Sequence, residues 1–216
     1  MNELLSGDTT LCTSPIARFI DSMKIDYEKW HDGIGYDIEA LKGANKRERE
    51  EIEQILVSKS PLDWRDIEAL AILDTPKARS TIIQALLGDN NEVNMAVLRF
   101  TPGLVSNELK TRVIVKALKS ARFFDGFSHT LNIVGEYHPE EVVNELFHGL
   151  IHREGGIAVH FAAMLYYIFG KAESIFDEEY RDFFLKFNTP RLSERKLLLK
   201  ELCEKINVDC TKYTRS

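Results

Sequence analysis

The sequence predicts an all-α fold, a right-handed α-solenoid of about four helical hairpins closed by non-repeat helical caps. Apolar residues recur at the spacing of amphipathic helices, between short breaks rich in Gly, Pro, Asn and Asp. The first helices of successive hairpins start at residues 45, 75, 106 and 138, at intervals of 30, 31 and 32 (75−45, 106−75, 138−106). Two-helix units at a near-constant period bury their apolar faces on their neighbours, which is the signature of a solenoid.

The stretch from residue 75 to residue 100 shows this pattern most clearly. Thr75 is a good N-cap, and Pro76 suits the first helical position, where no N–H partner is needed. Gly88 is expected to end this helix, and residues 89–91 supply the turn and the next cap. The apolar faces are formed by Ala78, Ile82, Ile83 and Leu86 in the first helix and by Val93, Ala96 and Val97 in the second. These faces exceed what one hairpin buries alone.

The run from Asp66 to Ala78 resembles the HEAT repeat family in its short variety. The resemblance extends from about residue 45 to residue 170. It implies one structural domain with an N-terminal cap and loop (1–44), HEAT-like repeats (45–170) and a C-terminal helical cap (171–216). HEAT repeats share an architecture rather than an activity, so the resemblance is specific for the fold and nearly silent about function.

The N-terminal part is predicted to cap one end of the repeats. Residues 1–14 are polar, and Ser14-Pro15 opens a short helical pattern. Two glycines and the large aromatic residues Trp30 and Tyr36 then mark an ordered loop. Either these two rings pin the loop to the first repeat, or they form a binding loop at the rim of the solenoid.

A charged helix from residue 45 to 59 begins the repeats, and Asp63 caps the helix that follows it. In that second helix Trp64 is predicted to face inward with the aliphatic residues of its stripe. Arg65 and Asp66 are predicted to face outward, as charged residues of an amphipathic helix usually do.

Two later helical patterns carry specific expectations. The helix from residue 138 to 152 is the clearest amphipathic one, and its inward positions are predicted to be Val143, Leu146, Phe147, Leu150 and Ile151. The helix that precedes it, from residue 123 to 134, is expected to be interrupted by Gly126. The segment from residue 164 to 169 is apolar nearly all round, so we expect its helix to be deeply buried.

After residue 170 the repeat pattern fails. Residues 174–187 alternate acidic with aromatic residues, and one helical face is predicted to hold Phe176, Tyr180, Phe183, Phe184 and Phe187. A last helix is predicted to begin at Ser193 and to turn its leucines inward. We expect this block to seal the far end of the solenoid.

The composition restricts the class of function. The 216 residues carry a net charge of −6, which argues against general nucleic-acid binding and permits a basic partner. The three cysteines, Cys12, Cys203 and Cys210, are too few and too uneven for a disulfide framework, so a reducing, cytoplasmic compartment is expected. We expect no signal peptide and no transmembrane helix.

The sequence does not predict a catalytic or metal site. His148 and His152 lie four residues apart on one predicted helix, a spacing able to hold a metal ion. A zinc site needs a third ligand, and Gly149 stands where the familiar motif has Glu, so solvated surface histidines are the preferred interpretation. We recognise neither an activated serine or cysteine nor a glycine-rich phosphate loop. The prediction is a non-catalytic protein without a cofactor.

Two surfaces besides the loop of Trp30 and Tyr36 are candidates for partner binding. One is the negative cluster of the C-terminal block, formed by Asp177, Glu178, Glu179, Tyr180 and Asp182. This cluster either recognises a basic protein or only solvates the cap. The other is the inner face of the second helices, where partners of solenoids bind, with the polar residues Glu92, Asn94, Asp125, His129, Asn132 and His160.

The acidic balance, the small size and the absent catalytic set resemble HEAT-like bacterial immunity proteins. Residues 170–172 and 181–189 are also similar to uncharacterised bacterial proteins of this kind. The resemblance implies a cytoplasmic antidote that neutralises a cognate toxin by direct binding. It also implies that the partner is a basic toxin domain, because the chain itself is acidic.

Three alternatives stay open at this point. HEAT-like alkylpurine DNA glycosylases have similar size and use aromatics and a carboxylate in a basic groove, for which Trp64, Asp66 and Arg99 are candidates. The negative net charge counts against that function. The short HEAT-like repeats of phycobilin lyases suggest a maturation factor, and a plain assembly scaffold would use the same architecture.

Overall fold

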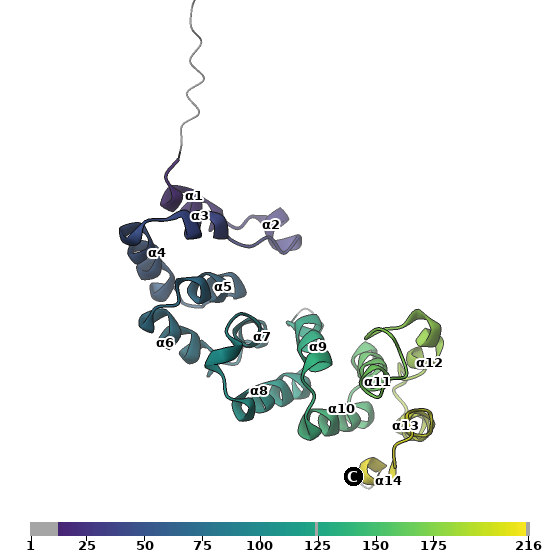
Figure 1. Ribbon diagram of the computed structural model, residues 1–216. Helices are drawn as coiled ribbons and strands as arrows, with labels where there is room; N and C mark the ends of the chain where they lie inside the picture. Colours follow the sequence, from purple (N-terminus) through teal and green to yellow (C-terminus); the bar gives the residue numbers. More distant parts are fainter. Residues whose placement is uncertain (1–12, 124, 215–216) are drawn as a thin grey trace, which may run out of the picture. The chain divides into compact units, whose positions relative to one another are not determined.

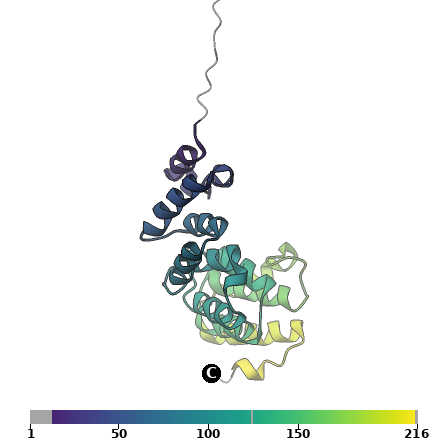
Figure 2. The same ribbon diagram turned by 60° about the vertical axis from the view of Figure 1, so that its left-hand side comes forward.

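The computed structural model describes residues 13–123 and 125–214, and this part of the chain contains helices and loops without a β-strand (Figures 1 and 2). The all-α prediction is therefore confirmed for these residues. Most of the predicted polar segment 1–14, with Cys12, lies outside the described residues. The chain divides into two compact units, of which the first ends at Ile82 and the second begins at Ile83.

Unit 1 is a set of short helices, namely α1 (Pro15–Ser22), α2 (Tyr27–His31), α3 (Ile38–Gly43), α4 (Lys46–Ser58), α5 (Trp64–Leu73) and the first part of α6 (Pro76–Ala85). Helix α1 packs against α3 and α4, and α5 packs against the same two helices. Their shared core consists of fully buried side chains, among them Phe19, Leu41, Ile52, Leu56, Ile67 and Leu70.

Unit 2 contains α7 (Asn91–Phe100), η1 (Pro102–Leu104), α8 (Asn107–Lys119), α9 (Phe127–Glu136), α10 (Glu140–His152), α11 (Gly156–Ile168), η2 (Glu178–Tyr180), α12 (Arg181–Leu185), α13 (Leu192–Ile206) and α14 (Thr211–Thr214). Helix α8 contacts α10, while α9 contacts α7 and α11, so these helices form two layers. Helix α13 packs against both α10 and α11 beyond the last hairpin (Figure 2).

Local capping explains why the helices start where the sequence predicts. Asn45 and Glu48 form a capping box at the start of α4, Asp63 and Asp66 form one at α5, and Ser106 caps α8. The first helices begin at residues 46, 76, 107 and 140, at intervals of 30, 31 and 33 (76−46, 107−76, 140−107). The boundary between the two units falls inside α6, so a solenoid spanning the whole chain stays a prediction.

Two predicted helices differ from the structure. Gly126 does not interrupt α9 but caps its start with a φ of 66°, and a Cβ there would lie 2.9 Å from the Cα of Glu92. Residues 174–187 do not form one long helix. The Asp177 carboxylate accepts hydrogen bonds from the backbone N–H groups of Glu173 and Glu179, which folds a turn ahead of η2 and α12.

The buried face of α10 is also displaced from the prediction. Val142 is fully buried and Val143 only half-buried, although the sequence pattern places Val143 inward. The reason is that α10 is covered by four helices, α8, α11, α13 and α14, so its buried face is wider than one stripe. Gly149 belongs to that face because a Cβ there would clash with the ring of Phe161, at 2.3 Å.

The two adjacent valines of α10 provide a test of this register. Val142→Asp should lower the free energy of unfolding by about 3 kcal/mol or more, because it buries a carboxylate without a partner. Val143→Asp should cost only about 1 kcal/mol, since water reaches that side chain. Urea denaturation of both variants measures the difference, and equal or reversed costs would show that the assigned face of α10 is wrong.

Candidate protein-binding surface

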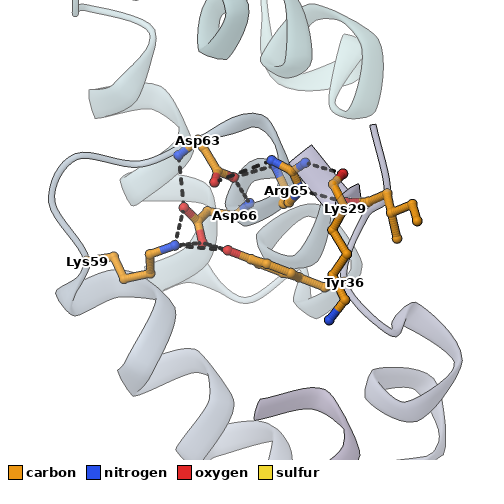
Figure 3. Close-up of polar contacts among 7 residues, drawn as sticks. Lys29, Tyr36, Lys59, Asp63, Arg65 and Asp66 are labelled. Atoms are coloured by element: carbon orange, nitrogen blue, oxygen red, sulfur yellow. Dashed lines mark hydrogen bonds and ion pairs between the residues drawn. The ribbon is translucent and has the colours of Figure 1, made fainter. Parts of the chain in front are cut away.

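Asp66, in the first turn of α5, is the most completely buried carboxylate in the described part of the chain, with no exposed surface. It accepts hydrogen bonds from the Lys59 Nζ (2.7 and 2.8 Å), the Tyr36 hydroxyl (2.9 Å) and the Asp63 backbone N–H (2.9 Å) (Figure 3). The prediction that Arg65 and Asp66 face outward is wrong, since both are buried. The first turn of α5 is covered by residues 29–37, which lie about 30 positions earlier in the sequence.

Electrostatics set which of these groups carries charge. Burial raises the pKa of Tyr36 to about 12, against the opposing effect of its hydrogen bond with Lys59, so the hydroxyl is neutral near pH 7. Burial acts to lower the pKa of Lys59, but its hydrogen bonds to Asp66 and Tyr36 prevail and the pKa is raised. Lys59 is therefore a cation that donates to both Asp66 and Tyr36, while Tyr36 donates to Asp66.

Arg65 anchors the same loop at a second place. Its Nε donates to the carbonyl of Ile34 (2.7 Å) and its Nη2 to the carbonyl of Lys29 (3.4 Å). In Figure 3 the Arg65 side chain points toward Lys29, away from Lys59. The loop also approaches α5 closely at Gly35, where a Cβ would lie 3.5 Å from the ring of Trp64. The first turn of α5 thus holds residues 29–36 at several points.

The loop so held carries an exposed apolar group, which we call the aromatic ledge and define as Tyr27, Trp30 and Ile34. Their exposed fractions are 74%, 64% and 48%. The ring centroids of Tyr27 and Trp30 lie 6.1 Å apart, so the two side chains form one patch on α2. Figure 1 shows α2 projecting beside α1 and α3 of unit 1. Large apolar side chains gathered at a surface mark interaction sites more often than single ones do.

The structure separates the two aromatic residues that the sequence paired. Tyr36 is buried and pins the loop, whereas Trp30 remains at the surface. Sequence reasoning missed Tyr27 and Ile34 as members of the exposed patch. The available signal was the spacing of Tyr27 and Trp30, which lie three residues apart and therefore on one side of a helix.

The predicted negative cluster is only partly available to a partner. Asp177 is half-buried because its carboxylate shapes the turn, and the half-buried ring of Tyr180 packs 4.8 Å from that of Tyr166. Glu178, Glu179 and Asp182 are exposed, and Arg181 lies 3.6 Å from Glu178. The surface therefore presents fewer uncompensated charges than the sequence suggests.

The predicted residues of the second helices do not form one continuous polar face. Asn94 is buried, and Asp125 is half-buried and accepts a hydrogen bond from the side chain of Asn91 (2.9 Å). The remaining positions are Glu92, half-buried, His129 and Asn132, both exposed, and His160, half-buried. The ring of His160 lies 5.3 Å from that of Phe176, and burial lowers its pKa. Only His129 and Asn132 are open to a partner.

The surroundings of His148, His152 and Cys203 bear on whether these side chains could bind a metal ion or act as a nucleophile. The rings of His148 and His152 lie 4.1 Å apart, but within residues 13–123 and 125–214 no three His, Cys, Asp or Glu side chains are arranged to hold a metal ion. Burial, with Cys210 close by, raises the pKa of Cys203 to about 12, so that thiol is a poor nucleophile at neutral pH.

Comparisons with protein families, with curated proteins and with solved structures find no match to this chain. The resemblance to HEAT-like immunity proteins therefore stays a prediction. None of the helices in the described part of the chain is long and apolar enough to cross a membrane.

The cost of breaking the buried ion pair tests the anchoring of the loop. Lys59→Met should lower the free energy of unfolding by about 3 kcal/mol or more, because Asp66 stays buried without its cation. Tyr36→Phe should cost about 1–2 kcal/mol, because one donor is lost. The control is Lys42→Met, which breaks the exposed pair of Lys42 with Glu39, also 2.8 Å long, and should cost less than about 1 kcal/mol. Similar costs for Lys59→Met and Lys42→Met would refute the anchoring role.

The raised pKa of Tyr36 predicts a loss of stability at alkaline pH. Tyr36 has an ordinary pKa of 10.0 and a pKa of about 12 in the fold, chiefly through burial. The stability linked to its neutral form is complete below pH 10 and is lost as the pH rises through 12. We expect the wild-type protein to lose more stability than Tyr36→Phe between these values, as measured by urea denaturation at each pH. Parallel curves for the two proteins would exclude Tyr36 as the cause.

Proposed function

We propose that this protein is a non-catalytic protein-binding module and that its partner contacts the aromatic ledge. The observation that carries the proposal is the contrast within one loop. Tyr27 and Trp30 are exposed to solvent, while the backbone beneath them is held by the buried side chains of Arg65 and Asp66. A preorganised apolar patch binds with little loss of conformational entropy.

The residue types and their surroundings favour a protein with a basic surface as the partner. Tyr and Trp are enriched among the side chains that dominate interface energies. Acidic residues flank the ledge at Asp26, Glu28 and Asp32, of which Asp32 contacts His31 (2.9 Å). The two nearby lysines are engaged, Lys24 with Asp21 (2.8 Å) and Lys29 with the backbone carbonyl of Lys24 (3.0 Å). The net charge of −6 acts over a longer range in the same direction.

Within this class we favour an immunity protein, an antidote that neutralises a cognate bacterial toxin by direct binding in the cytoplasm. The support is the resemblance of residues 45–170 to short HEAT repeats, the acidic charge and the two-layer packing of hairpins inside unit 2. A right-handed solenoid is the architecture that this packing favours. An antidote benefits from opposite charge because fast association must precede damage.

An assembly scaffold is the alternative that uses the same ledge and differs only in the partner. The glycosylase alternative is weakened by the position of Asp66, because that carboxylate is buried and already accepts bonds from three donor groups. No feature of the described residues favours a phycobilin lyase-like maturation factor over protein binding.

The experiment is to purify the complex with proteins encoded by neighbouring genes and to measure its association and dissociation rates. Trp30→Ala should raise the Kd at least about tenfold, mainly through faster dissociation, as expected for an interface centre. Leu197→Ala is the matched control, since Leu197 in α13 is an equally exposed apolar side chain at 66% and should leave the Kd unchanged. If the partner is a toxin, Trp30→Ala should also protect cells less well.

A triple charge reversal at the exposed members of the negative cluster, Glu178→Lys, Glu179→Lys and Asp182→Lys, separates the ledge from that cluster. A slower association with unchanged dissociation would show that the cluster only steers the partner. A large loss of affinity in the triple variant, together with a normal Trp30→Ala variant, would overturn the ledge as the binding surface.

A further inference from the structure

The two tryptophans of the chain have different surroundings. Trp64 is half-buried, and the guanidinium of Arg65 lies over its ring, 4.5 Å from the centroid. Trp30 is 64% exposed, an exposure that requires at least one face of the indole to be open to solvent. Within residues 13–123 and 125–214, no lysine or arginine side chain lies over Trp30 or over its neighbour Tyr27.

A cation over an aromatic ring is common elsewhere in this protein. The half-buried rings that carry a lysine or an arginine at 4.3 to 5.7 Å from the centroid, besides Trp64, are those of Phe100, Tyr137, Phe183 and Tyr213. The attraction comes from the negative face of the ring and is strongest for tryptophan. The ring type that attracts a cation most strongly is therefore left open on the aromatic ledge.

The lysines beside the ledge are engaged with other groups. The Nζ of Lys24 donates to the carboxylate of Asp21 (2.8 Å), and the Nζ of Lys29 donates to the backbone carbonyl of Lys24 (3.0 Å). Neither amine lies over the indole of Trp30. A cation on the open face of this ring would therefore come from another molecule.

A carboxylate lies in the helical turn next to Trp30. The Trp30 N–H donates to the backbone carbonyl of Asp26 (3.0 Å), and helical side chains lean toward the N-terminus, so the indole covers the turn that begins at Asp26. The Oδ1 of Asp26 caps α2 by accepting from the Lys29 N–H (2.8 Å). Its Oδ2 has no hydrogen-bond partner in the described part of the chain, and the residue is exposed. One carboxylate oxygen is thus available to a donor that lies on the ring.

From these contacts we infer that the aromatic ledge recognises an arginine side chain of the partner, whose guanidinium stacks on Trp30 and donates to Asp26. Arginine fits this arrangement better than lysine, because a planar guanidinium stacks on a ring while its N–H groups still reach a carboxylate. Its aliphatic stem suits the apolar side chains of Tyr27 and Ile34. This inference rests on the proposed function, since it names the group that the partner places on the ledge.

The test titrates the protein with acetyl-arginine methylamide and follows the indole N–H NMR signals of both tryptophans. The Trp30 signal should shift, and the Trp64 signal should not, because Arg65 already lies over that ring. The neutral isostere acetyl-citrulline methylamide and the apolar acetyl-norleucine methylamide should each bind at least about threefold more weakly, as expected for an exposed cation–π contact. Equal or tighter binding of either probe, or no shift of the Trp30 signal, would overturn the inference.

Two changes separate the ring from the carboxylate. Asp26→Asn keeps a good helix cap and removes the charge, so it should weaken binding of the arginine probe at least about twofold. Glu51→Gln, which removes an exposed carboxylate of α4, is the matched control and should leave the affinity unchanged. Incorporation of 5-fluorotryptophan withdraws electrons from the ring faces and nearly preserves the shape, so it should weaken the arginine probe and not the norleucine probe. An arginine affinity that resists both Asp26→Asn and fluorination would refute the assigned contacts.

The proposed function and the recognition of arginine fail in different ways. If Trp30→Ala leaves the Kd of the partner complex unchanged, the ledge is not the binding surface and the proposed function is wrong. If Trp30→Ala weakens the complex while Asp26→Asn and fluorination do not, the ledge binds through apolar area alone. In that case only the recognition of arginine is overturned.

Discussion

The hydrogen bonds that converge on Asp66 are the constraint on which the described surface of unit 1 depends. They join the end of α4 through Lys59, the loop before α3 through Tyr36 and the start of α5 through Asp63. Because a carboxylate without exposed surface is costly when unpaired, none of these segments can move away alone. The aromatic ledge is thereby attached to a part of the unit that several buried hydrogen bonds hold in place.

A buried ion pair of this kind is weak support for stability as such, since apolar side chains of equal volume often serve as well. Its value here lies in geometry. Arg65 and Asp66 are neighbours in sequence and point in different directions, so one helical turn binds the loop through two opposite charges (Figure 3). Lys59 and Asp66 hold the loop at the Tyr36 hydroxyl, and Arg65 holds it at the backbone carbonyls of Lys29 and Ile34, so the loop is fixed at both of its ends.

Features determined by local sequence were predictable, and features determined by distant contacts were not. Asn45, Asp63 and Ser106 cap helices through residues two or three positions away, so the helix starts could be predicted from the chain alone. The burial of Asp66 depends on Tyr36, 30 positions earlier, and no periodicity reveals it. Val142 and Val143 show the same limit, because an amphipathic stripe cannot indicate how many helices will cover it. The exposure of Trp30 rather than Tyr36 was equally hidden.

The aromatic ledge and the net charge use different physics, which would separate their contributions to the proposed binding. The ledge presents apolar area whose burial is short-ranged, so in the proposed complex it would govern how long a partner stays. The net charge of −6 acts at a distance and is screened by salt, so it would govern how fast a basic partner arrives. In such a complex the residence time and the association rate would depend on separate groups of residues, and a substitution in the ledge would change the first while leaving the second.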